Sequence, residues 1–318
     1  MATRGIQSVL LLGKESTWGT AVATAKYLGL IQSISTEVAQ GSKEYHGIGQ
    51  AKAAETGGGL LNLRLTIDFM PTNGRFLEYF MFGGTTTHVD DSATDCTHTL
   101  VYANDMPSFT VHEAYEKGGT DLENVWSGFI ADSCTLSMNV DGELSCSVSG
   151  VCKDLDASGT TAESPPTQNE APIKGFQGGL NIGGAVSLVQ SWSLTTSRNA
   201  KVIHGMGDRV PADGGSNILN TSFSAKIGYN ANTWDAGVSG AAGGGTSAEP
   251  SDVTVTLSGD NGVALGSGER SISLALANGQ YSNSSRNSGL NDFVMNDISG
   301  VGTLSTTTFV DQVLQASW

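Results

Sequence analysis

The sequence is poor in charged residues, in proline and in long apolar runs. Of its 318 residues, 15% are charged and 7 are proline, whereas 42 are glycine. An ordinary soluble domain has about 25% charged residues. The apolar run at residues 9–12 is too short for the core of a signal peptide or for a membrane span. We therefore expect a chain that is made in the cytoplasm and crosses no bilayer.

Cysteine and histidine are also scarce. The 4 cysteines form no CxxC pair and the 5 histidines are scattered, so the spacing of a zinc site is missing. An acidic stretch with Asp90, Asp91 and Asp95 lies near His88 and His98. Because no further ligands converge on it, we interpret this stretch as a solvated turn. The sequence predicts no metal and no other cofactor.

Catalytic motifs are missing as well. The sequence has no GxSxG elbow, no HExxH, no P-loop and no GxGxxG that leads from a strand into a helix. An esterase or glycosidase would need a nucleophile with its base, or paired carboxylates in one cleft, and no spacing indicates either. We expect a protein that is not an enzyme.

Basic residues are outnumbered two to one. With 16 Lys and Arg against 31 Asp and Glu, the formal net charge is -15. Nucleic-acid binders gain affinity from Lys and Arg contacts to phosphate, so this balance opposes adhesion to DNA. Two interpretations stay open: the charge serves solubility alone, or the protein forms a conduit that DNA traverses without sticking.

Alternating apolar and polar residues are abundant and predict β-strands. Residues 61–69 place apolar side chains at every odd position, which is the period of a half-buried strand. The same alternation recurs in residues 222–229, 253–257 and 271–276, with a last strand near residues 304–310. We predict an all-β fold built from β-sandwich or β-barrel modules with short flanking helices.

Two short helices are expected beside the strands. In the first, Asn73 is a candidate cap, residues 76–81 carry an apolar stripe, and Gly83 with Gly84 ends the helix. A helix this short must lie against the sheet to be stable. The second is expected around residues 290–297.

A hairpin is predicted around Asp141 and Gly142. A two-residue loop would put the apolar faces of the two strands on opposite sides. A three-residue loop pairs Val140 with Leu144 and brings those faces together, so we predict that register. It also buries three of the cysteines as free thiols, which fits a reducing compartment. These are Cys134, Cys146 and Cys152.

The chain is predicted to contain two β modules, at residues 1–154 and 175–318, joined by a linker at residues 155–174 that has two adjacent prolines. Each half offers several strands and one short helix, which indicates a distant duplication from element order alone. The segments at residues 41–59 and 237–250 are long and glycine-rich, as is typical of binding loops or of disordered segments.

Four stretches, in this order, resemble the tail tube proteins of long-tailed bacteriophages. They are KESTWGTA at residues 14–21, MPSFTV at 106–111 followed by WSGF at 126–129, FQGGLNIGG at 176–184 leading to WSL, and RNA at 198–200. Where the family often has Gly-Cys, this chain has Gly128 and Phe129.

The resemblance implies a structural virion protein of the phage tail, assembled in the host cytoplasm. Its copies would form stacked rings, and the rings a hollow tube through which viral DNA passes. Two modules per chain predict a trimeric ring with pseudo-sixfold symmetry, and a hexameric ring is the alternative. Tail terminator and tail-tip proteins would be further partners, while a terminator or sheath role for the chain itself stays open.

Two sets of residues are candidates for roles in such a tube. Residues 41–59 are expected to reach an adjacent subunit or ring. Their charged residues are Lys43, Glu44, Lys52 and Glu55. Arg64 and Asp68, on the polar face of the clearest strand, are candidates to face the lumen, whose wall is expected to be net negative.

A function of another class is a carbohydrate-binding or adhesive β-sandwich. Trp126, Trp192 and Trp234 could line a sugar-binding groove, although tryptophan in a β-sandwich more often lies in the core. This alternative predicts a monomer that binds sugar.

Overall fold

The computed structural model describes residues 8–23, 27–49, 55–83, 86–90, 95–117, 120–159, 171–182, 188–229, 253–264, 269–288, 293–305 and 307–312. The first half contains β1 (Ser8–Lys14), β2 (Gly29–Tyr45), β3 (Glu55–Pro71), α1 (Arg75–Leu77), the π-helical turn η2 (Glu78–Phe82), β4 (Thr86–Asp90), β5 (Asp95–Leu100), β6 (Phe109–Lys117), β7 (Thr120–Asn139), β8 (Ser145–Cys152) and β9 (Asp154–Gly159).

The described residues of the second half form strands only: β10 (Lys174–Ile182), β11 (Val189–Ser197), β12 (Lys201–His204), β13 (Pro211–Gly215), β14 (Asn220–Gly228), β15 (Val253–Ala264), β16 (Glu269–Asn287), β17 (Met295–Leu304) and β18 (Thr307–Gln312). The predicted all-β class is confirmed.

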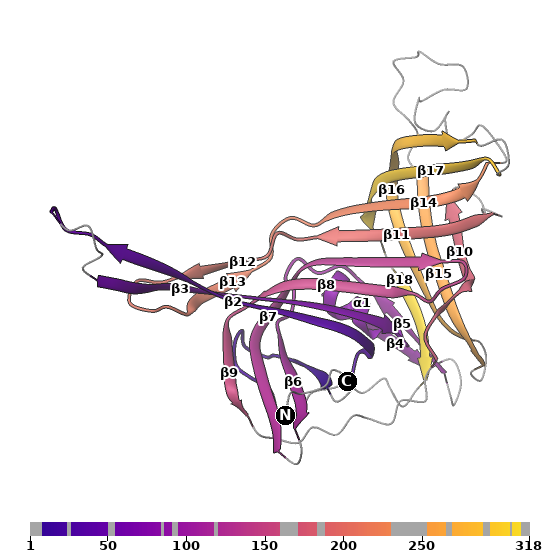
Figure 1. Ribbon diagram of the computed structural model, residues 1–318. Helices are drawn as coiled ribbons and strands as arrows, with labels where there is room; N and C mark the ends of the chain where they lie inside the picture. Colours follow the sequence, from indigo (N-terminus) through magenta and orange to yellow (C-terminus); the bar gives the residue numbers. More distant parts are fainter. Residues whose placement is uncertain are drawn as a thin grey trace.

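One antiparallel sheet runs through both halves of the chain (Figure 1). Its main path has the strand order β2-β3-β8-β7-β11-β14-β17-β16-β18-β5-β4, and we call the first eight of these strands the main sheet. The sheet crosses from the first half to the second where β7 pairs with β11. Each half therefore contributes four neighbouring strands.

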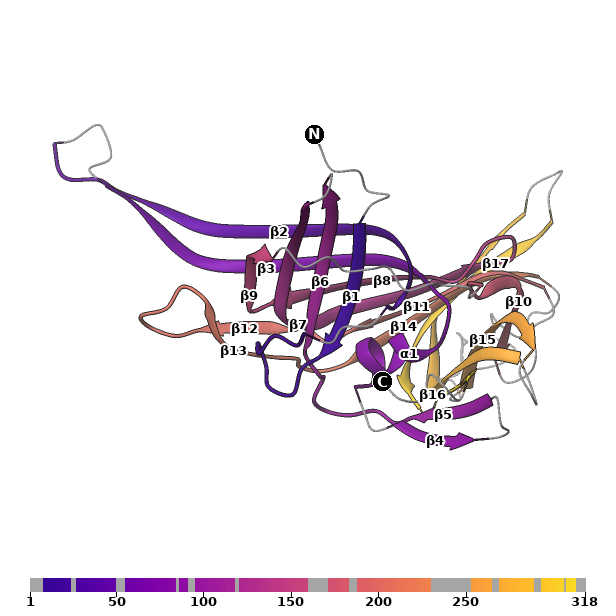
Figure 2. The ribbon, with the colours of Figure 1, turned by 90° about the horizontal axis from the view of Figure 1, so that it is seen from below.

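A second layer covers one face of the main sheet in each half. In the first half, β1 pairs with β6, and β6 and β9 both pair with the N-terminal part of β7. In the second half, β10 pairs with β15, and β15 and β18 both pair with the N-terminal part of β16. Figure 2 shows β1 and β6 crossing the direction of β2, β3 and β8. The long strands β7 and β16 therefore belong to both layers.

The core lies between these layers and follows the alternation in the sequence. Leu65, Ile67 and Phe69 of β3 are 0–1% exposed, as expected for the inward face of a half-buried strand. The ring of Phe69 packs edge-on against Phe76 and Phe80 of the helical segment, with centroids 5.8 and 6.3 Å apart. Burial of each such side chain stabilises the fold by about 1.5–3 kcal/mol.

The first predicted helix is confirmed and ends at the predicted Gly83, but its N-cap is Gly74 and not Asn73. The backbone N–H of Arg75 donates to Oδ1 of Asn73 at 3.0 Å. The segment ends at Gly83, whose φ of 64° lies in the left-handed region that favours glycine. The last turn is π-helical, and the N–H of Gly83 donates to the carbonyl of Glu78.

The predicted hairpin has the right faces but a wrong register. Leu136, and not Met138, lies opposite Cys146, which is a slip of two residues. The reason is tertiary: the N–H of Leu144 donates to the carbonyl of Ile173, at 2.8 Å, instead of joining the β7–β8 ladder. All four cysteines are buried free thiols, and the Sγ atoms of Cys134 and Cys146 lie 3.7 Å apart.

Three further expectations change. The second helix was expected at residues 290–297, but of these Met295, Asn296 and Asp297 form the start of strand β17. Residues 155–159, in the expected linker, lie in β9. Residues 41–45 and 55–59, expected in a loop, are strands that extend the β2–β3 hairpin. The expected loop at 237–250 lies outside the described residues.

Candidate assembly surface

Two hairpins project from the same end of the main sheet (Figure 1). We call the distal part of β2–β3, residues 41–49 and 55–59, the arm. The β12–β13 hairpin lies beside its base: the N–H of Leu61 donates to the carbonyl of Arg209, and the Arg209 Nε–H donates to the carbonyl of Gly59. These bonds, at 3.0 and 3.1 Å, fix the direction in which the arm leaves the sheet.

The arm carries the residues predicted to contact another subunit. Lys43 and Glu44 lie in β2, opposite Gly57 and Thr56, and Glu55 is opposite Tyr45. Lys52 lies outside the described residues. Several apolar side chains of the two hairpins are exposed, including Val38, Tyr45, Ile48, Ile203 and Met206. A projecting hairpin has no hydrophobic core of its own, so these side chains can be buried only by contact with another molecule.

The outer face of the main sheet is covered by hydroxyl groups, and we call it the hydroxyl face. One row of directly paired residues crosses six strands: Ser33, Asp68, Ser147, Thr135, Thr195 and Ser222. A second row crosses six strands as Ser145, Ser137, Ser193, Ser224, Ser299 and Asn283. Neighbours bond to each other, as the hydroxyls of Thr135 and Thr195 do at 3.1 Å.

Arg64 and Asp68 both lie on the hydroxyl face, as the strand period predicted. Asp68 accepts hydrogen bonds from the hydroxyls of Ser33 and Ser147, at 2.5 and 2.6 Å. Arg64 is exposed, opposite Glu37 of β2. The carboxylate of Asp68 is thus held within the row, whereas the guanidinium of Arg64 faces solvent.

A shallow hollow lies on the hydroxyl face over β7, β11, β14, β17 and β16. Its volume is about 360 Å³, and its wall includes Ser193, Ser224, Lys226 and Asp297. The lining is mostly small polar side chains. Such a surface offers weak, exchangeable hydrogen bonds, and its two charged side chains, Lys226 and Asp297, lie opposite each other on β14 and β17.

The first two of the four stretches, KESTWGTA and MPSFTV with WSGF, meet at one buried carboxylate, that of Glu15. Its Oε2 accepts from the N–H of Gly19 at 2.8 Å and from the hydroxyl of Ser108 at 2.6 Å. Its Oε1 accepts from the hydroxyl of Thr110 at 2.9 Å and from the N–H of Gly128 at 2.8 Å. Glu15 is 7% exposed, and these four hydrogen bonds offset the cost of burying its carboxyl group.

Trp18 extends this junction to the second half of the chain. Its indole N–H donates to the carbonyl of Gly128 at 3.1 Å, and the Lys153 ammonium lies 4.7 Å from the centre of its ring. On β13, a Cβ on Gly214 would come within 2.6 Å of the Trp18 ring, so this glycine allows the close approach. The sequence indicated the motif but not these partners.

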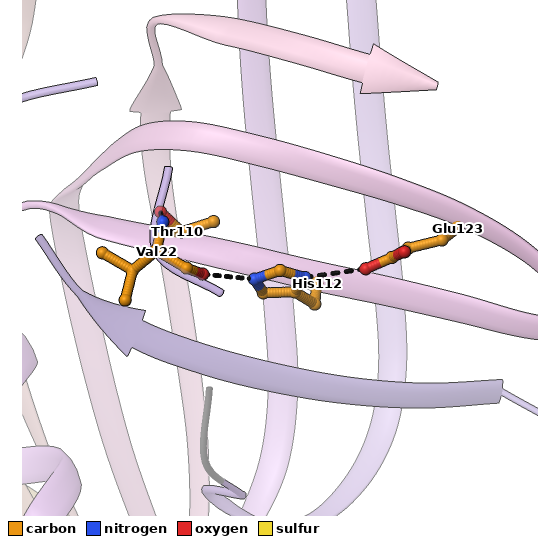
Figure 3. Close-up of polar contacts among 4 residues, drawn as sticks. All are labelled: Val22, Thr110, His112 and Glu123. Atoms are coloured by element: carbon orange, nitrogen blue, oxygen red, sulfur yellow. Dashed lines mark hydrogen bonds and ion pairs between the residues drawn. The ribbon is translucent and has the colours of Figure 1, made fainter. Parts of the chain in front are cut away.

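His112 contacts the same N-terminal segment at Val22 (Figure 3). One ring nitrogen, Nδ1, lies 2.8 Å from Oε1 of Glu123, and the other, Nε2, lies 2.7 Å from the carbonyl of Val22. The N–H of Val22 also donates to the hydroxyl of Thr110 at 3.0 Å. Thr110 and His112 of β6 and Glu123 of β7 are buried, and Val22 is half-buried, so the contacts attach the N-terminal segment to these two strands.

Arg198, from the fourth motif, ties the second half to the helical segment. It is 2% exposed, and its Nη2 donates to the carbonyl of Met81 at 2.8 Å. Its guanidinium also lies 4.8 Å from the centre of the Tyr102 ring. Burial lowers the pKa of this guanidinium from its usual value. The motif is therefore structural.

No catalytic or sugar-binding arrangement stands out in the described part of the chain. Trp126 and Trp192 are buried in the core, at 1% and 3% exposure, and Trp234 lies outside the described residues. Among the described residues no group of three or more His, Cys, Asp or Glu side chains could hold a metal ion. No helix in the described ranges is long and apolar enough to span a membrane.

The family of the chain follows from a comparison that spans nearly all of it. No curated protein matches the sequence. The profile of one protein family, described as phage tail tube protein, matches residues 5–300. That range holds the Glu15 junction, the arm and nearly all of the main sheet. The chain therefore belongs to the phage tail tube protein family.

Proposed function

We propose that this structural protein of the phage tail assembles into rings, and that the rings stack into a hollow tube through which viral DNA enters the host. Membership of the tail tube family supports a tube built from copies of this chain in contact with other tail proteins. The main sheet carries the proposal further, because it is wide, curved and polar on its outer face.

The ring is proposed to be a trimer with pseudo-sixfold symmetry. Each half of the chain contributes four strands to the main sheet in the same spatial order, which supports two tube modules at residues 1–154 and 175–318. Three chains would then supply six equivalent units. A hexamer remains the alternative if the second half is an elaboration.

The hydroxyl face is proposed to line the lumen, with Arg64 and Asp68 on it. Its two rows of paired residues carry Ser and Thr at most positions, which offer no fixed charge to a phosphate. In these rows and beside them, the acids Glu37, Asp68 and Asp297 outnumber the bases Arg64 and Lys226. A wall of this kind would let DNA slide without adhering.

The arm is proposed to contact the adjacent subunit or ring through Lys43, Glu44, Lys52 and Glu55. Its support is the projection of the arm beyond the sheet and its exposed apolar side chains. Contacts from one ring to the next are heterologous, and such contacts produce an open filament.

Negative-stain electron microscopy of the purified protein over a concentration series tests this function. We expect stacked rings or hollow tubes, with three subunits in each layer. Six subunits in each layer would select the hexamer. A chain that stays monomeric even when a tail-tip complex is added would contradict the proposal.

A further inference from the structure

The base of the arm is held by a hairpin from the other half of the chain. Towards the arm, β8 pairs with β3 as far as Leu63 and then ends at Cys152. Beyond that point the same edge of β3 bonds to the β12–β13 hairpin, through Gly59 and Leu61. We call this hairpin, residues 201–215, the support hairpin; it projects beside the arm (Figure 2). It takes the place of β8 as the neighbour of β3.

The support hairpin reaches β3 through His204 and Arg209. The carbonyl of Arg209 accepts a hydrogen bond from the Leu61 N–H at 3.0 Å, and Nε2 of His204 lies 2.9 Å from the Leu61 carbonyl oxygen. The Nε–H of Arg209 donates to the carbonyl of Gly59 at 3.1 Å. Both backbone groups of Leu61 therefore contact the support hairpin.

The arm needs this contact because it is a two-stranded ribbon. Beyond Leu61 its described residues in β2 and β3 pair with each other. A two-stranded hairpin is marginally stable on its own, and its twist varies more than that of a wider sheet. Bonds to a third partner at Gly59 and Leu61 remove this freedom where the arm leaves the sheet. The direction of the arm thus depends on where the support hairpin lies.

A small apolar cluster attaches the support hairpin to the main sheet. Strands β12 and β13 form a two-stranded sheet of their own. On the main sheet Ile130 and Val151 lie directly opposite each other, and they form the cluster with Ala200. Val202 of β12 and Trp18 of the N-terminal segment pack against it. Because the cluster is small and separate from the main core, its apolar contacts depend on each member.

Trp18 lies between the main sheet and the support hairpin. On one side its indole N–H donates to the carbonyl of Gly128 in β7, at 3.1 Å. On the other side a Cβ added to Gly214 of β13 would come within 2.6 Å of the ring. The backbone beside Trp18 is fixed as well, because the N–H of Gly19 donates to the Glu15 carboxylate at 2.8 Å. The ring therefore sets the separation between β13 and β7.

We propose that Trp18 is a positioning residue for the arm. Its ring sets the place of the support hairpin, and the support hairpin sets the direction of the arm. This inference rests on the assembly role proposed above for the arm. A binding element that is already held in its bound direction loses less freedom on contact, which favours association. A change at Trp18 therefore weakens assembly by way of the support hairpin.

Alanine at Gly214 and alanine at Gly215 form a matched pair for the test. The two residues are neighbours in β13, but a Cβ on Gly214 meets the Trp18 ring, whereas a Cβ on Gly215 meets no atom within 4 Å. Trp18→Ala changes the same contact from the side of the N-terminal segment. Gly214→Ala leaves that segment unchanged, so it carries the test if Trp18→Ala does not fold.

Hydrogen exchange in the unassembled chain measures whether the support hairpin holds the arm. The Leu61 N–H is the probe, because it donates to that hairpin. We expect its exchange to be at least about tenfold faster in Trp18→Ala and Gly214→Ala than in wild type, and unchanged in Gly215→Ala. The amide of Ile67, in the core part of β3, should keep its rate. A general loss of stability would accelerate both amides.

Electron microscopy over a concentration series measures assembly of the same variants. The concentration at which tubes form should rise at least about tenfold for Trp18→Ala and for Gly214→Ala, and stay at the wild-type value for Gly215→Ala. The double variant should assemble no worse than Trp18→Ala alone, because the added Cβ no longer meets a ring.

The outcomes separate this inference from the proposed function. Faster exchange at Leu61 with normal assembly would overturn the role of Trp18 in assembly. Impaired assembly with unchanged exchange would overturn the route through the support hairpin, and wild-type behaviour in both measurements would overturn the whole inference. If the wild-type chain forms no rings, the proposed function fails, and exchange at Leu61 still decides whether Trp18 positions the arm.

Discussion

The carboxylate of Glu15 accepts a hydrogen bond from the backbone N–H of Gly128, at 2.8 Å across 113 residues of sequence. Gly128 has a φ of 68°, in the left-handed region, and a Cβ there would lie 2.6 Å from the Lys153 side chain. Two short motifs far apart in the sequence are thus explained by one contact that ties the N-terminal segment to β7.

Replacing Glu15 by Gln should destabilise the chain. Each oxygen of the carboxylate accepts two hydrogen bonds. In Gln an NH2 group would replace one of these oxygens and would face two donors. We expect the free energy of unfolding to fall by about 1–3 kcal/mol, because a buried donor is left without an acceptor. Urea denaturation measures it. The exposed control Glu44→Gln should stay within about 0.5 kcal/mol of wild type, and equal stabilities for both variants would contradict this role.

Shortening the arm should abolish tubes and spare the fold. Because Ser42 pairs with Gly58, residues 43–57 can be replaced by an Asn-Gly turn without changing the register below them. We expect a folded monomer with an unchanged urea midpoint, and no tubes in electron micrographs. Deletion of residues 47–58 alone would remove the strand partners of residues 42–45. That deletion would disturb the hairpin itself, so it tests the assembly role less cleanly. Normal tubes from the shortened arm would refute its assembly role.

Substitution of Gly150 or Gly300 by Ala should be costly in each half. Either Cβ would lie 2.3 Å from a backbone carbonyl oxygen, which the ladder cannot easily move. We expect each variant to lose about 1–3 kcal/mol of unfolding free energy, as overpacked sites do. Gly215→Ala is the matched control, because a Cβ added there would have no atom within 4 Å. If only one of the two glycines proves sensitive, the equivalence of the halves is weakened.

The buried thiols should make the fold less stable in alkali. Burial raises the pKa of the Cys146 and Cys152 thiols above the usual value of 9.0. Above about pH 9 these thiols ionise in the unfolded chain but not in the folded one. The free energy of unfolding should then fall by about 1.4 kcal/mol per pH unit for each thiol.

Urea denaturation of wild type and Cys152→Ala between about pH 7 and 11 checks this dependence. Both should be independent of these thiols below about pH 8. At higher pH the variant should fall less steeply than wild type, by one thiol's contribution. Parallel slopes for the two proteins would show that Cys152 ionises equally in both states.

Several features of this protein were predictable because they depend on neighbouring residues. The alternation in β3 determines which side chains face the core, and Gly83 determines where the helical segment ends. The short motifs pointed to the tail tube family without indicating what the residues do.

Features that depend on distant partners were not predictable. The register of β7 and β8 differs from the predicted one by two residues, because the N–H of Leu144 donates to the carbonyl of Ile173. Residues 295–297 form a strand because they pair with β14 and β16. Residues 30–35 read LIQSIS and residues 188–193 read LVQSWS; their flanking sequences differ, and the strand pairing aligns them. The sequence by itself determined strand faces and the family, because alternation and motifs are local. Only the tertiary structure decided register, the meeting of motifs at Glu15 and the repeat of the sheet, because backbone pairing across the chain sets them.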